Sequence, residues 1–552
     1  MTDWYVLVPA TYPWGGIDFY PAKQGGLELT FHHQSFNSFG DENVPWRTGK
    51  ICQQTSLRHS GRRIYDHEPM SRDERLAWHF SRAQEWLLSA SNDALVQSGD
   101  PFELPDFPTR TIVQTAFVEN SDSFQIWSTT PERIGYAAVM RHESNEGILF
   151  LTSFMDVRRK RILDNRFGVA LEKSFRKTGD ALWIRLDTPP VLDPWHPPDR
   201  LGELLKILAP KGVELKAIIQ QLAHPIRDGK RHLLLLGFPI PRNIGDPPDH
   251  FHWQPFLLPV LSNGKVKGFQ PKENSYQRRD NAVVLQDNML IEWVRSRNWD
   301  STELTSRGAL PPEVARNKIA LIGVGALGAP MAHLLVRMRI DDLIVIDGDL
   351  LDVGNLCRHP EVVKNVARPK AESVATSLNA AVPHANVSFI NKNLSACDEK
   401  DLQLIQDRDV IIDCTGNDTL LSELAQWEWA SEKLFISVSV GRFARRLFYF
   451  VYQGKRFPHE SFAQKVSPWL AQEANDYKDL PWPREGIGCW NPVFPARSDD
   501  IWLMASMATK LFEYDAMHRP VDSVFRVYEQ SFVDGLPTGL RKMDDGASDA
   551  QR

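Results

Sequence analysis

The residues most informative about chemistry lie between Lys318 and Asn417. Three glycines, Gly323, Gly325 and Gly328, lie within and after the apolar run KIALIGV, which is typical of a buried strand. Glycines at this spacing let the backbone turn tightly against a phosphate at the N-terminus of a helix. NAD, FAD and several ATP enzymes share such a loop, so the glycines predict a nucleotide site without choosing the nucleotide.

Charged and polar residues after the loop narrow this choice. The second predicted strand, LIVID, ends in Asp347, and Asp349 follows two residues later. Asn355 and Arg358 come next in NLCRH, and Lys370 lies twelve residues after that arginine. A dehydrogenase has no evident use for an arginine and a lysine that neutralise a triphosphate. An enzyme that cleaves ATP between its α- and β-phosphates does, because negative charge builds on the leaving pyrophosphate.

Residues 305–450 resemble the adenylation domain shared by ubiquitin-activating enzymes and the bacterial thiamine and molybdopterin sulfur-carrier adenylyltransferases. The gapped pattern as a whole carries the resemblance, more than its glycines. It implies that Asp347 binds the ATP ribose and that Asp349 orients the nucleotide or Mg²⁺. It also implies that the side chains of Asn355, Arg358 and Lys370 approach the phosphates. The alternatives are that Asp347 is the ribose acid of a dehydrogenase and that Asp349 caps a turn. Arg358 could likewise be a solvated loop arginine, and Lys370 could lie on an exposed helix face.

Two further positions of the resembled site have no certain counterpart in this chain: the metal-binding aspartate and an upstream arginine. Sulfur-carrier adenylyltransferases read D-C-T-D-N, whose second aspartate holds magnesium, whereas this chain reads DCTGND and has Gly416 there. Asp413 and Asp418 are the candidate replacements. The family also uses an arginine upstream of the glycine loop that reaches a partner's site. Arg307 is the candidate for that role, and Arg316 is the alternative.

The resemblance implies ATP and Mg²⁺ as cofactors and the C-terminal carboxylate of a protein as substrate. A carboxylate is a poor acylating agent because oxide is a poor leaving group. Its attack on the α-phosphate of ATP forms an acyl-adenylate, from which AMP leaves readily. Arginine, lysine and Mg²⁺ then stabilise the departing pyrophosphate by position and charge.

Cys489 is a candidate to carry the activated acyl group. It lies in the loop PREGIGCWNPVFP, ahead of a helix predicted from Ser498 with Asp499 and Asp500 in its first turn. A thiol beside a helix N-terminus can have a lowered pKa and attack an adenylate. In the resembled activating enzymes, a cysteine after the nucleotide fold does this. The alternative is a buried cysteine that acts as a small hydrophobic residue.

Cys52 is the second candidate carrier. Before it come YPWGGIDFYP and HHQSFNS, and after WRTGKICQQTS comes the helical stretch RLAWHFSRAQEWLL. This order resembles a ubiquitin-conjugating domain, in which His33 and Asn37 would match the His-Pro-Asn element whose asparagine supports an oxyanion. The proline is missing, and the fold usually has a longer segment before its cysteine, so a first helix and strand are lost or lie upstream. The alternative is a strand-end cysteine in an unrelated β-rich domain.

Bulk properties exclude several functional classes. The net charge of −6, from 64 basic and 70 acidic residues, gives no basic footprint for nucleic acid. No apolar run has the length of a membrane span, and the N-terminus lacks the features of a secretory signal. Five scattered cysteines without a C-x-x-C pair argue against a structural zinc and a disulfide framework, and favour a reducing cytoplasm.

The 552 residues are expected to form several domains of an α/β protein. Residues 1–110 are expected to form an α+β ubiquitin-conjugating-like domain, and residues 111–300 a mixed α/β middle region of unknown role. Between 305 and 540, strands and helices alternate as a doubly wound, Rossmann-like adenylation domain requires. Residues 541–552 read as a disordered tail.

The chain as a whole resembles bacterial fusions of a conjugating-like and an activating-like domain in antiphage (CBASS) operons. The motif NLCRH, which ends in His359, points the same way. The resemblance implies adenylation of the C-terminus of a ubiquitin-like protein or a cyclic-nucleotide synthase, capture on Cys489, and transfer through Cys52 to an amine of a target protein. It also implies a homodimer through the adenylation domain. Three alternatives stay open: a sulfur-carrier-type adenylyltransferase without a thioester, a weakened nucleotide-binding scaffold, and a dehydrogenase.

Overall fold

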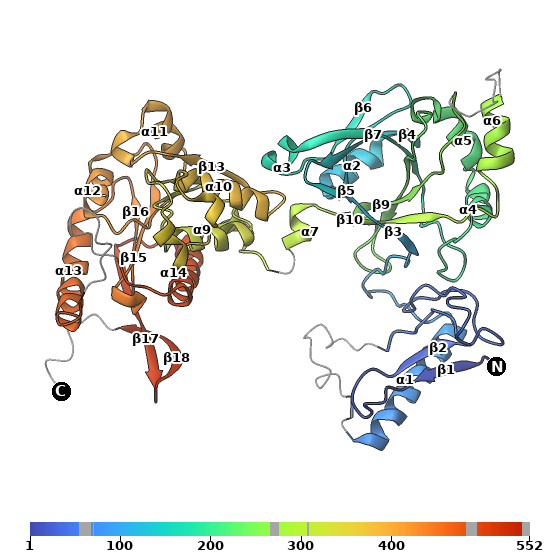
Figure 1. The fold of residues 1–552 in the computed structure, drawn as a ribbon, viewed down its shortest axis with the longest axis horizontal. Helices are drawn as coiled ribbons and strands as arrows, with labels where there is room; N and C mark the ends of the chain where they lie inside the picture. The colour runs from blue at the N-terminus through green and yellow to red at the C-terminus, as the bar shows by residue number, and fades with distance from the viewer. Residues whose placement is uncertain (54–67, 70, 265–274, 306–307, 482–493, 544–552) are drawn as a thin grey trace. The chain divides into compact units, whose positions relative to one another are not determined.

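The computed structural model describes residues 1–53, 68–69, 71–264, 275–305, 308–481 and 494–543. The chain divides into two compact units (Figure 1). The first consists of Met1–Arg166 and Phe175–Asp300, and the second of Phe167–Ser174 and Ser301–Arg552. No helix of the described residues is long and apolar enough to cross a membrane. Most of the predicted tail lies outside the described residues, and its first three residues end strand β18.

The first unit begins with a small α+β part. Strands β1 (Trp4–Leu7) and β2 (Asp18–Pro21) pair antiparallel, and helix α1 (Arg72–Ser91) follows them in the chain. Acidic residues in the first turn of α1 suit the positive end of the helix dipole. The helix buries a stripe at helical spacing, formed by Arg75, His79, Ala83 and Trp86. Ala83 and Trp86 pack into a core with Ile17, Phe19 and Ile51.

The rest of the first unit is an eight-stranded mixed sheet. Its order is β3-β10-β9-β8-β7-β4-β5-β6, and β3 also pairs with β5, so the sheet closes on itself. Its strands are β3 (Thr109–Phe117), β4 (Ile134–His142), β5 (Asn145–Met155), β6 (Arg161–Asp164), β7 (Phe175–Arg185), β8 (Leu233–Ile240), β9 (His250–Leu257) and β10 (Glu292–Asn298). Its helices are α2 (Ser121–Thr129), α4 (Leu201–Leu208), α5 (Leu215–Leu222) and α6 (Ser275–Arg279). The predicted mixture of helix and strand is confirmed.

The second unit is built on another eight-stranded sheet, of order β13-β12-β11-β14-β15-β16-β17-β18. The strands from β13 to β15 are parallel, and β16, β17 and β18 continue the sheet antiparallel. The strands are β11 (Ile319–Ile322), β12 (Asp342–Ile346), β13 (Asn386–Ile390), β14 (Val410–Asp413), β15 (Lys433–Val440), β16 (Arg446–Gly454), β17 (Val524–Val533) and β18 (Leu536–Met543). Strands β11 and β14 are buried throughout, as apolar runs between two helix layers should be.

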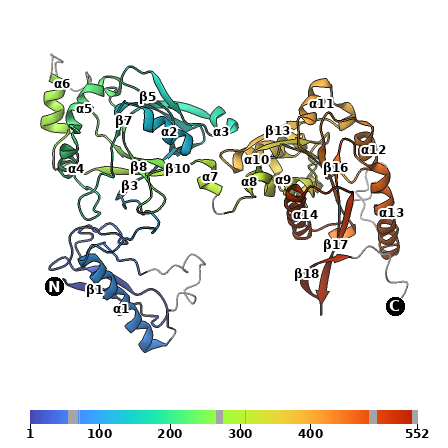
Figure 2. The same cartoon turned by 180° about the vertical axis from the view of Figure 1, so that it is seen from behind.

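Helices cover both faces of this sheet (Figure 2). One face packs against α8 (Pro312–Ala315), α9 (Gly328–Arg337), α10 (Lys370–Ala381) and α14 (Ser498–His518). The other packs against α11 (Glu399–Gln406), α12 (Asp418–Gln426) and α13 (His459–Asp476). The unit also contains α3 (Val169–Lys173) and α7 (Ser301–Thr305). This is the expected doubly wound, Rossmann-like arrangement, and the strand order reverses between β11 and β14.

Candidate active site

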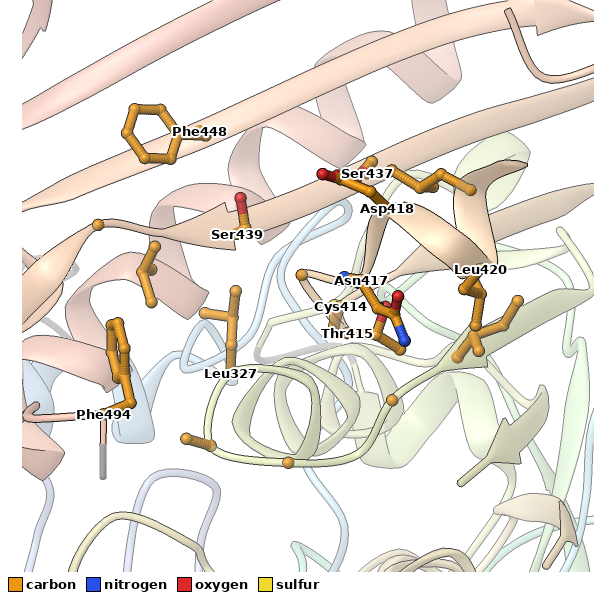
Figure 3. Close-up of a pocket in the computed structure, with 18 of the residues that line it drawn as sticks. Leu327, Cys414, Thr415, Asn417, Asp418, Leu420, Ser437, Ser439, Phe448 and Phe494 are labelled. Carbon is orange, nitrogen blue, oxygen red and sulfur yellow. Dashed lines mark hydrogen bonds between the residues drawn. The ribbon is translucent and has the colours of Figure 1, made fainter. Parts of the chain in front are cut away.

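A cavity lies where the strand order of the second unit reverses. In open α/β sheets, ligands bind at the carboxyl ends of the strands at such a switch point. The cavity has a volume of about 1080 Å³, and loops after β11, β12, β13 and β14 contribute to its lining. Figure 3 shows Leu327, Thr415, Asn417 and Ser439 around this space. The site predicted from the glycine loop therefore coincides with a cavity large enough for a nucleotide and part of a second substrate.

The three glycines of the loop have different reasons to lack a side chain. Gly323 has a φ of +84°, and a Cβ there would lie 2.7 Å from the side chain of Thr415. A Cβ on Gly328, the first residue of α9, would lie 1.9 Å from the Gly323 carbonyl oxygen. A Cβ on Gly325 would meet no described heavy atom within 4 Å, and Gly325 lines the cavity. The fold requires the outer two glycines, whereas Gly325 leaves space for a ligand.

Asp347 directly follows β12 and lines the cavity. Its Oδ2 accepts a hydrogen bond from the Val324 backbone N–H at 3.0 Å, and its Oδ1 accepts one from the Asp349 N–H at 2.9 Å. Burial raises the pKa of Asp347, while the Asp349 N–H and the Lys370 ammonium act in the opposite direction. Each carboxylate oxygen can accept a further hydrogen bond, which is what a ribose diol requires.

Lys370 and Asp349 contribute a pair of opposite charges to the cavity lining. Lys370 begins α10, and its Nζ donates to Asp349 Oδ2 at 2.9 Å. The Lys370 side chain is 13% exposed and that of Asp349 is 70% exposed. The ammonium therefore stands at a helix N-terminus, where an anion is favoured. Lys392 also lines the cavity, but it donates to Asp398 at 2.8 Å and to Asp401 at 2.6 Å.

The segment that carries Asn355 and Arg358 forms a 3₁₀ turn, Val353–Cys357. The Asn355 side-chain oxygen accepts a hydrogen bond from the Asp352 N–H at 3.1 Å. Among the described residues, Asn355 and Arg358 are not part of the cavity lining. Of the three predicted phosphate ligands, all of which are described, Lys370 lines the cavity, and Asn355 and Arg358 do not.

His359 braces the glycine loop, a role that the sequence did not indicate. It is buried, and its Nε2 lies 2.7 Å from the carbonyl oxygen of Val324. A carbonyl only accepts, so Nε2 carries the proton, and Nδ1 accepts from the Glu361 N–H at 3.3 Å. Burial lowers the pKa of His359, which agrees with a neutral ring.

The two candidate metal ligands have different environments. Asp413 is buried, and its carboxylate accepts hydrogen bonds from the Thr415 N–H at 2.9 Å, the Thr415 hydroxyl at 2.6 Å and the Ser437 hydroxyl at 2.8 Å. Burial raises the pKa of Asp413. Asp413 is absent from the described cavity lining, whereas the exposed Asp418, at the start of α12, is part of it.

The donor set at Asp418 fits Mg²⁺. Among the described residues, no three His, Cys, Asp or Glu side chains converge as a metal site. Mg²⁺ in nucleotide sites needs no such cluster, because one or two carboxylates, water and substrate phosphates suffice. Asp418 offers one such carboxylate from within the cavity. Gly416, at the position of the family's acid, has a φ of +62° and also lines the cavity.

The predicted carriers of the acyl group are only partly described. Cys489 and Arg307 lie outside the described residues. Cys52 is an exposed free thiol, and its backbone N–H donates to the His33 carbonyl at 2.7 Å. Asn37 is buried and donates its amide hydrogens to the carbonyls of Leu27 and Leu29, so it is not available to an acyl group on Cys52.

The other described thiols differ in reactivity. Burial raises the pKa of Cys397 to about 11 and that of Cys414 well above its ordinary value, so both are weak nucleophiles. Cys357 is exposed, and its Sγ donates to the Gly354 carbonyl at 3.3 Å.

Comparisons with known proteins cover nearly the whole chain. Residues 93–299 match the model of the Cap2 central linker domain, and residues 312–473 match that of the ThiF family. The chain is 33% identical over 531 residues to the ATP-dependent ubiquitin transferase-like protein Cap2 of Enterobacter hormaechei subsp. hoffmannii (strain UCI 50). That alignment covers 95% of this chain and 86% of the relative.

Two further similarities cover less of the chain. The molybdopterin-synthase adenylyltransferase of Haemophilus influenzae is 31% identical over 111 residues, which span 20% of this chain and 44% of that protein. A crystal structure of E. coli MccB with ATP is 14% identical, with a TM-score of 0.29, over 42% of this chain and 65% of that chain.

The long match and the two domain matches confirm the resemblance inferred from the residues. The chain is an enzyme that belongs to the Cap2 family of ATP-dependent ubiquitin transferase-like proteins, with an adenylyltransferase domain of the ThiF family.

Proposed function

We propose that the cavity of the second unit activates the C-terminal carboxylate of a partner protein with ATP, and that Cys489 and then Cys52 carry the acyl group to an amine. The partner is a cyclic-nucleotide synthase or a ubiquitin-like protein, since both offer a C-terminal carboxylate. The observation that carries the proposal is the union, in one cavity, of the open space at Gly325, the acid Asp347 and the ammonium of Lys370.

Each lining group has a part in adenylation. The loop at Gly325 and the N-terminus of α9 receive the phosphates, and Asp347 accepts hydrogen bonds from the ribose hydroxyls. An oxygen of the partner's carboxylate attacks the α-phosphorus of ATP, and the bond to pyrophosphate breaks. Lys370 stabilises the charge on the leaving group. Asp418 would hold Mg²⁺, which supplies further positive charge to the phosphates.

Thiol chemistry follows activation. The Cys489 thiolate attacks the carbonyl carbon of the acyl-adenylate, a C–S bond forms, and AMP leaves. Cys52 attacks the resulting thioester and releases the Cys489 thiolate. An amine then attacks the Cys52 thioester, loses a proton and releases the Cys52 thiolate. Two observations support this route: the exposure of Cys52, and the similarity over 531 residues to a protein described as ubiquitin transferase-like.

Exchange of labelled pyrophosphate into ATP tests the activation step. We expect Lys370→Ala to lower the partner-dependent exchange rate on the order of 100-fold, because one charge on the leaving group is lost. Lys318→Ala is a matched control, since Lys318 also pairs with an aspartate at 2.9 Å but precedes β11, at the opposite end of the strand. Equal exchange by the two variants would refute the assignment of the cavity.

Trapping on non-reducing gels tests the relay. We expect Cys489→Ala to abolish the reducible adduct with the partner, and Cys52→Ala to abolish the final conjugate while the adduct on Cys489 remains. Cys357→Ala is the control, because Cys357 is also an exposed thiol. Pyrophosphate exchange without any adduct would instead favour a sulfur-carrier-type adenylyltransferase.

A further inference from the structure

The buried stripe of α1 is polar at its N-terminal end. Arg75 and His79 are 6% and 2% exposed, and they precede the apolar Ala83 and Trp86 on the same face. Buried charged or polar side chains are costly unless they are hydrogen-bonded. Arg75 satisfies this requirement by donating to Glu68 at 2.7 Å and to the carbonyls of Pro13 and Gly15.

His79 lies between Glu68 and Gln53. Its Nε2 is 2.6 Å from Glu68 Oε1, and its Nδ1 is 2.8 Å from Gln53 Oε1. The Gln53 amide is oriented by a second bond, because its Nε2 donates to the His79 backbone carbonyl at 2.9 Å. The Gln53 oxygen therefore faces the ring, and an oxygen acceptor requires a proton on Nδ1.

The second ring nitrogen also faces an acceptor. Arg75, which is always charged, contacts Glu68 Oε1 through Nη2 at 2.6 Å and through Nε at 2.7 Å, and a carboxyl group paired with a guanidinium in this way is ionised. The direction of the Glu68 pKa agrees: burial raises it, but the hydrogen bonds and the Arg75 charge lower it overall. Nε2 of His79 must then carry a proton as well. With protons on both nitrogens, His79 is an imidazolium that bridges an amide and a carboxylate.

This bridge acts on the backbone next to Cys52. Gln53 is 7% exposed and is held to α1 by two hydrogen bonds to His79. On the other side, the Cys52 N–H donates to the His33 carbonyl at 2.7 Å. Cys52 is thus anchored through its own backbone N–H and through the next residue, Gln53. Of these two anchors, only the one at Gln53 involves a titratable side chain, that of His79.

We propose that His79 is a positioning residue for Cys52: as an imidazolium, it clamps Gln53 to α1 and so holds the Cys52 thiol in place for acyl transfer. The inference rests on the proposed role of Cys52 as an acyl carrier. The reaction itself is the thioester exchange described above, in which the Cys52–carbonyl bond forms as the Cys489–carbonyl bond breaks. His79 neither gives nor takes a proton in that step. It restricts where Sγ can lie, and a displacement of about 1 Å can cost on the order of 100-fold in rate.

The test measures transfer to Cys52 in the full chain, with ATP and the cyclic-nucleotide synthase or ubiquitin-like protein that supports pyrophosphate exchange. We expect His79→Gln to lower the rate of Cys52 acylation at saturating partner on the order of 10- to 100-fold. The half-saturating partner concentration should equal that of the wild type, because in the proposed function the partner binds at the cavity of the second unit. The rate of pyrophosphate exchange should also be unchanged. The rate of alkylation of Cys52 by iodoacetamide should be unchanged too, since the thiol stays exposed.

Two further variants separate positioning from stability. His252→Gln is the matched control, because His252 is likewise buried in the first unit and contacts a glutamine, Gln254, at 3.3 Å. Gln53→Met removes the clamp while leaving His79, Glu68 and Arg75 in place, so it serves if His79→Gln does not fold. We expect Gln53→Met to slow transfer as His79→Gln does, and His252→Gln to leave it unchanged.

The protonation state has its own readout. In ¹⁵N spectra of histidine-labelled protein, assigned by the loss of one signal in His79→Gln, both ring nitrogens of His79 should carry protons at neutral pH. One unprotonated ring nitrogen, or wild-type transfer by folded Gln53→Met, would overturn the inference. Conjugation that survives Cys52→Ala would instead refute the proposed relay itself.

Discussion

His359 donates from Nε2 to the carbonyl oxygen of Val324 at 2.7 Å and so ties the NLCRH segment to the glycine loop. The bond crosses 35 residues of sequence. The same loop is held from the other side by Asp347, which accepts from the Val324 N–H. Val324 is thus fixed through both of its backbone polar groups, which restricts the conformation of the loop that receives the phosphates in the proposed function.

Loss of this brace should weaken ATP binding more than it weakens the fold. A neutral hydrogen bond contributes about 1 kcal/mol, so we expect His359→Gln to raise the Kd for ATP about 5-fold. Isothermal titration with ATP measures the change. His518→Gln is the control, because His518 makes a bond of the same kind, at 2.7 Å to the Tyr514 carbonyl within its own helix. An unchanged Kd in His359→Gln would show that the loop needs no brace.

The glycines of the loop should separate folding from binding. We expect Gly323→Ala to lower the melting temperature, because its φ of +84° and the approach to Thr415 both oppose a side chain. We expect Gly325→Ala to melt like the wild type, since its Cβ meets open space, yet to lose affinity for ATP at least 10-fold. Thermal unfolding with and without ATP compares them. A large loss of stability in Gly325→Ala would mean that this glycine serves the fold instead.

The strand and turn motifs of the sequence predicted those parts of the site whose position depends on the backbone of neighbouring residues. The glycine loop and Asp347 follow from a buried strand, a tight turn and the strand after it, and all lie in or at the cavity. Asn355 and Arg358 could not be placed in the same way. Their orientation depends on a 3₁₀ turn that Asp352 caps, and hydrophobic periodicity does not encode that turn.

Side-chain and strand pairings that the local pattern does not encode explain the remaining differences. Asp413 is buried because Ser437 lies opposite it on β15, a pairing of strands that are separated in sequence. Lys392 lines the cavity but is neutralised by Asp398 and Asp401. In the first unit, the β-like runs were visible, but the order of the strands was not, since β3 pairs with β10 from far along the chain.

Glu119 should make the stability of the first unit depend on pH. Its carboxylate is buried and accepts from the indole N–H groups of Trp127 and Trp253 at 2.8 Å and 2.7 Å. Burial raises its pKa from 4.5 to about 7, although these donors and Ser123 oppose the rise. Because the folded state holds the proton more tightly, Glu119 stabilises the fold below pH 4.5 and loses that contribution as the pH rises to 7. The difference corresponds to about 3 kcal/mol.

Glu119→Gln should remove this dependence, because the amide keeps an oxygen acceptor for an indole and does not ionise. We expect the difference in melting temperature between pH 5 and pH 7.5 to shrink in the variant, as measured by scanning calorimetry of the full chain. Glu143→Gln is the control, since Glu143 forms an exposed ion pair with Arg176. An identical pH response in wild type and Glu119→Gln would contradict the assigned titration.

Gly416 stands where the sulfur-carrier enzymes have an acid, and its surroundings permit one. Its φ of +62° lies in the left-handed region, which aspartate and asparagine tolerate better than most residues. A Cβ there would lie 4.0 Å from the Ser439 Cβ, an ordinary contact, and the position lines the cavity. The glycine is therefore not required by close packing, and the missing carboxylate can be restored by substitution.

We expect Gly416→Asp to lower the Mg²⁺ concentration that gives half-maximal pyrophosphate exchange several-fold, because Mg²⁺ gains a second carboxylate beside Asp418. Gly416→Asn is the matched control, with nearly the same shape and backbone preference but no charge. Asp418→Asn should shift the requirement in the opposite direction, since it removes the carboxylate to which the proposed function assigns Mg²⁺. If the Asp and Asn variants at position 416 shared one Mg²⁺ dependence, the metal would have to bind away from this turn, and Asp418 would lose its assigned role with it.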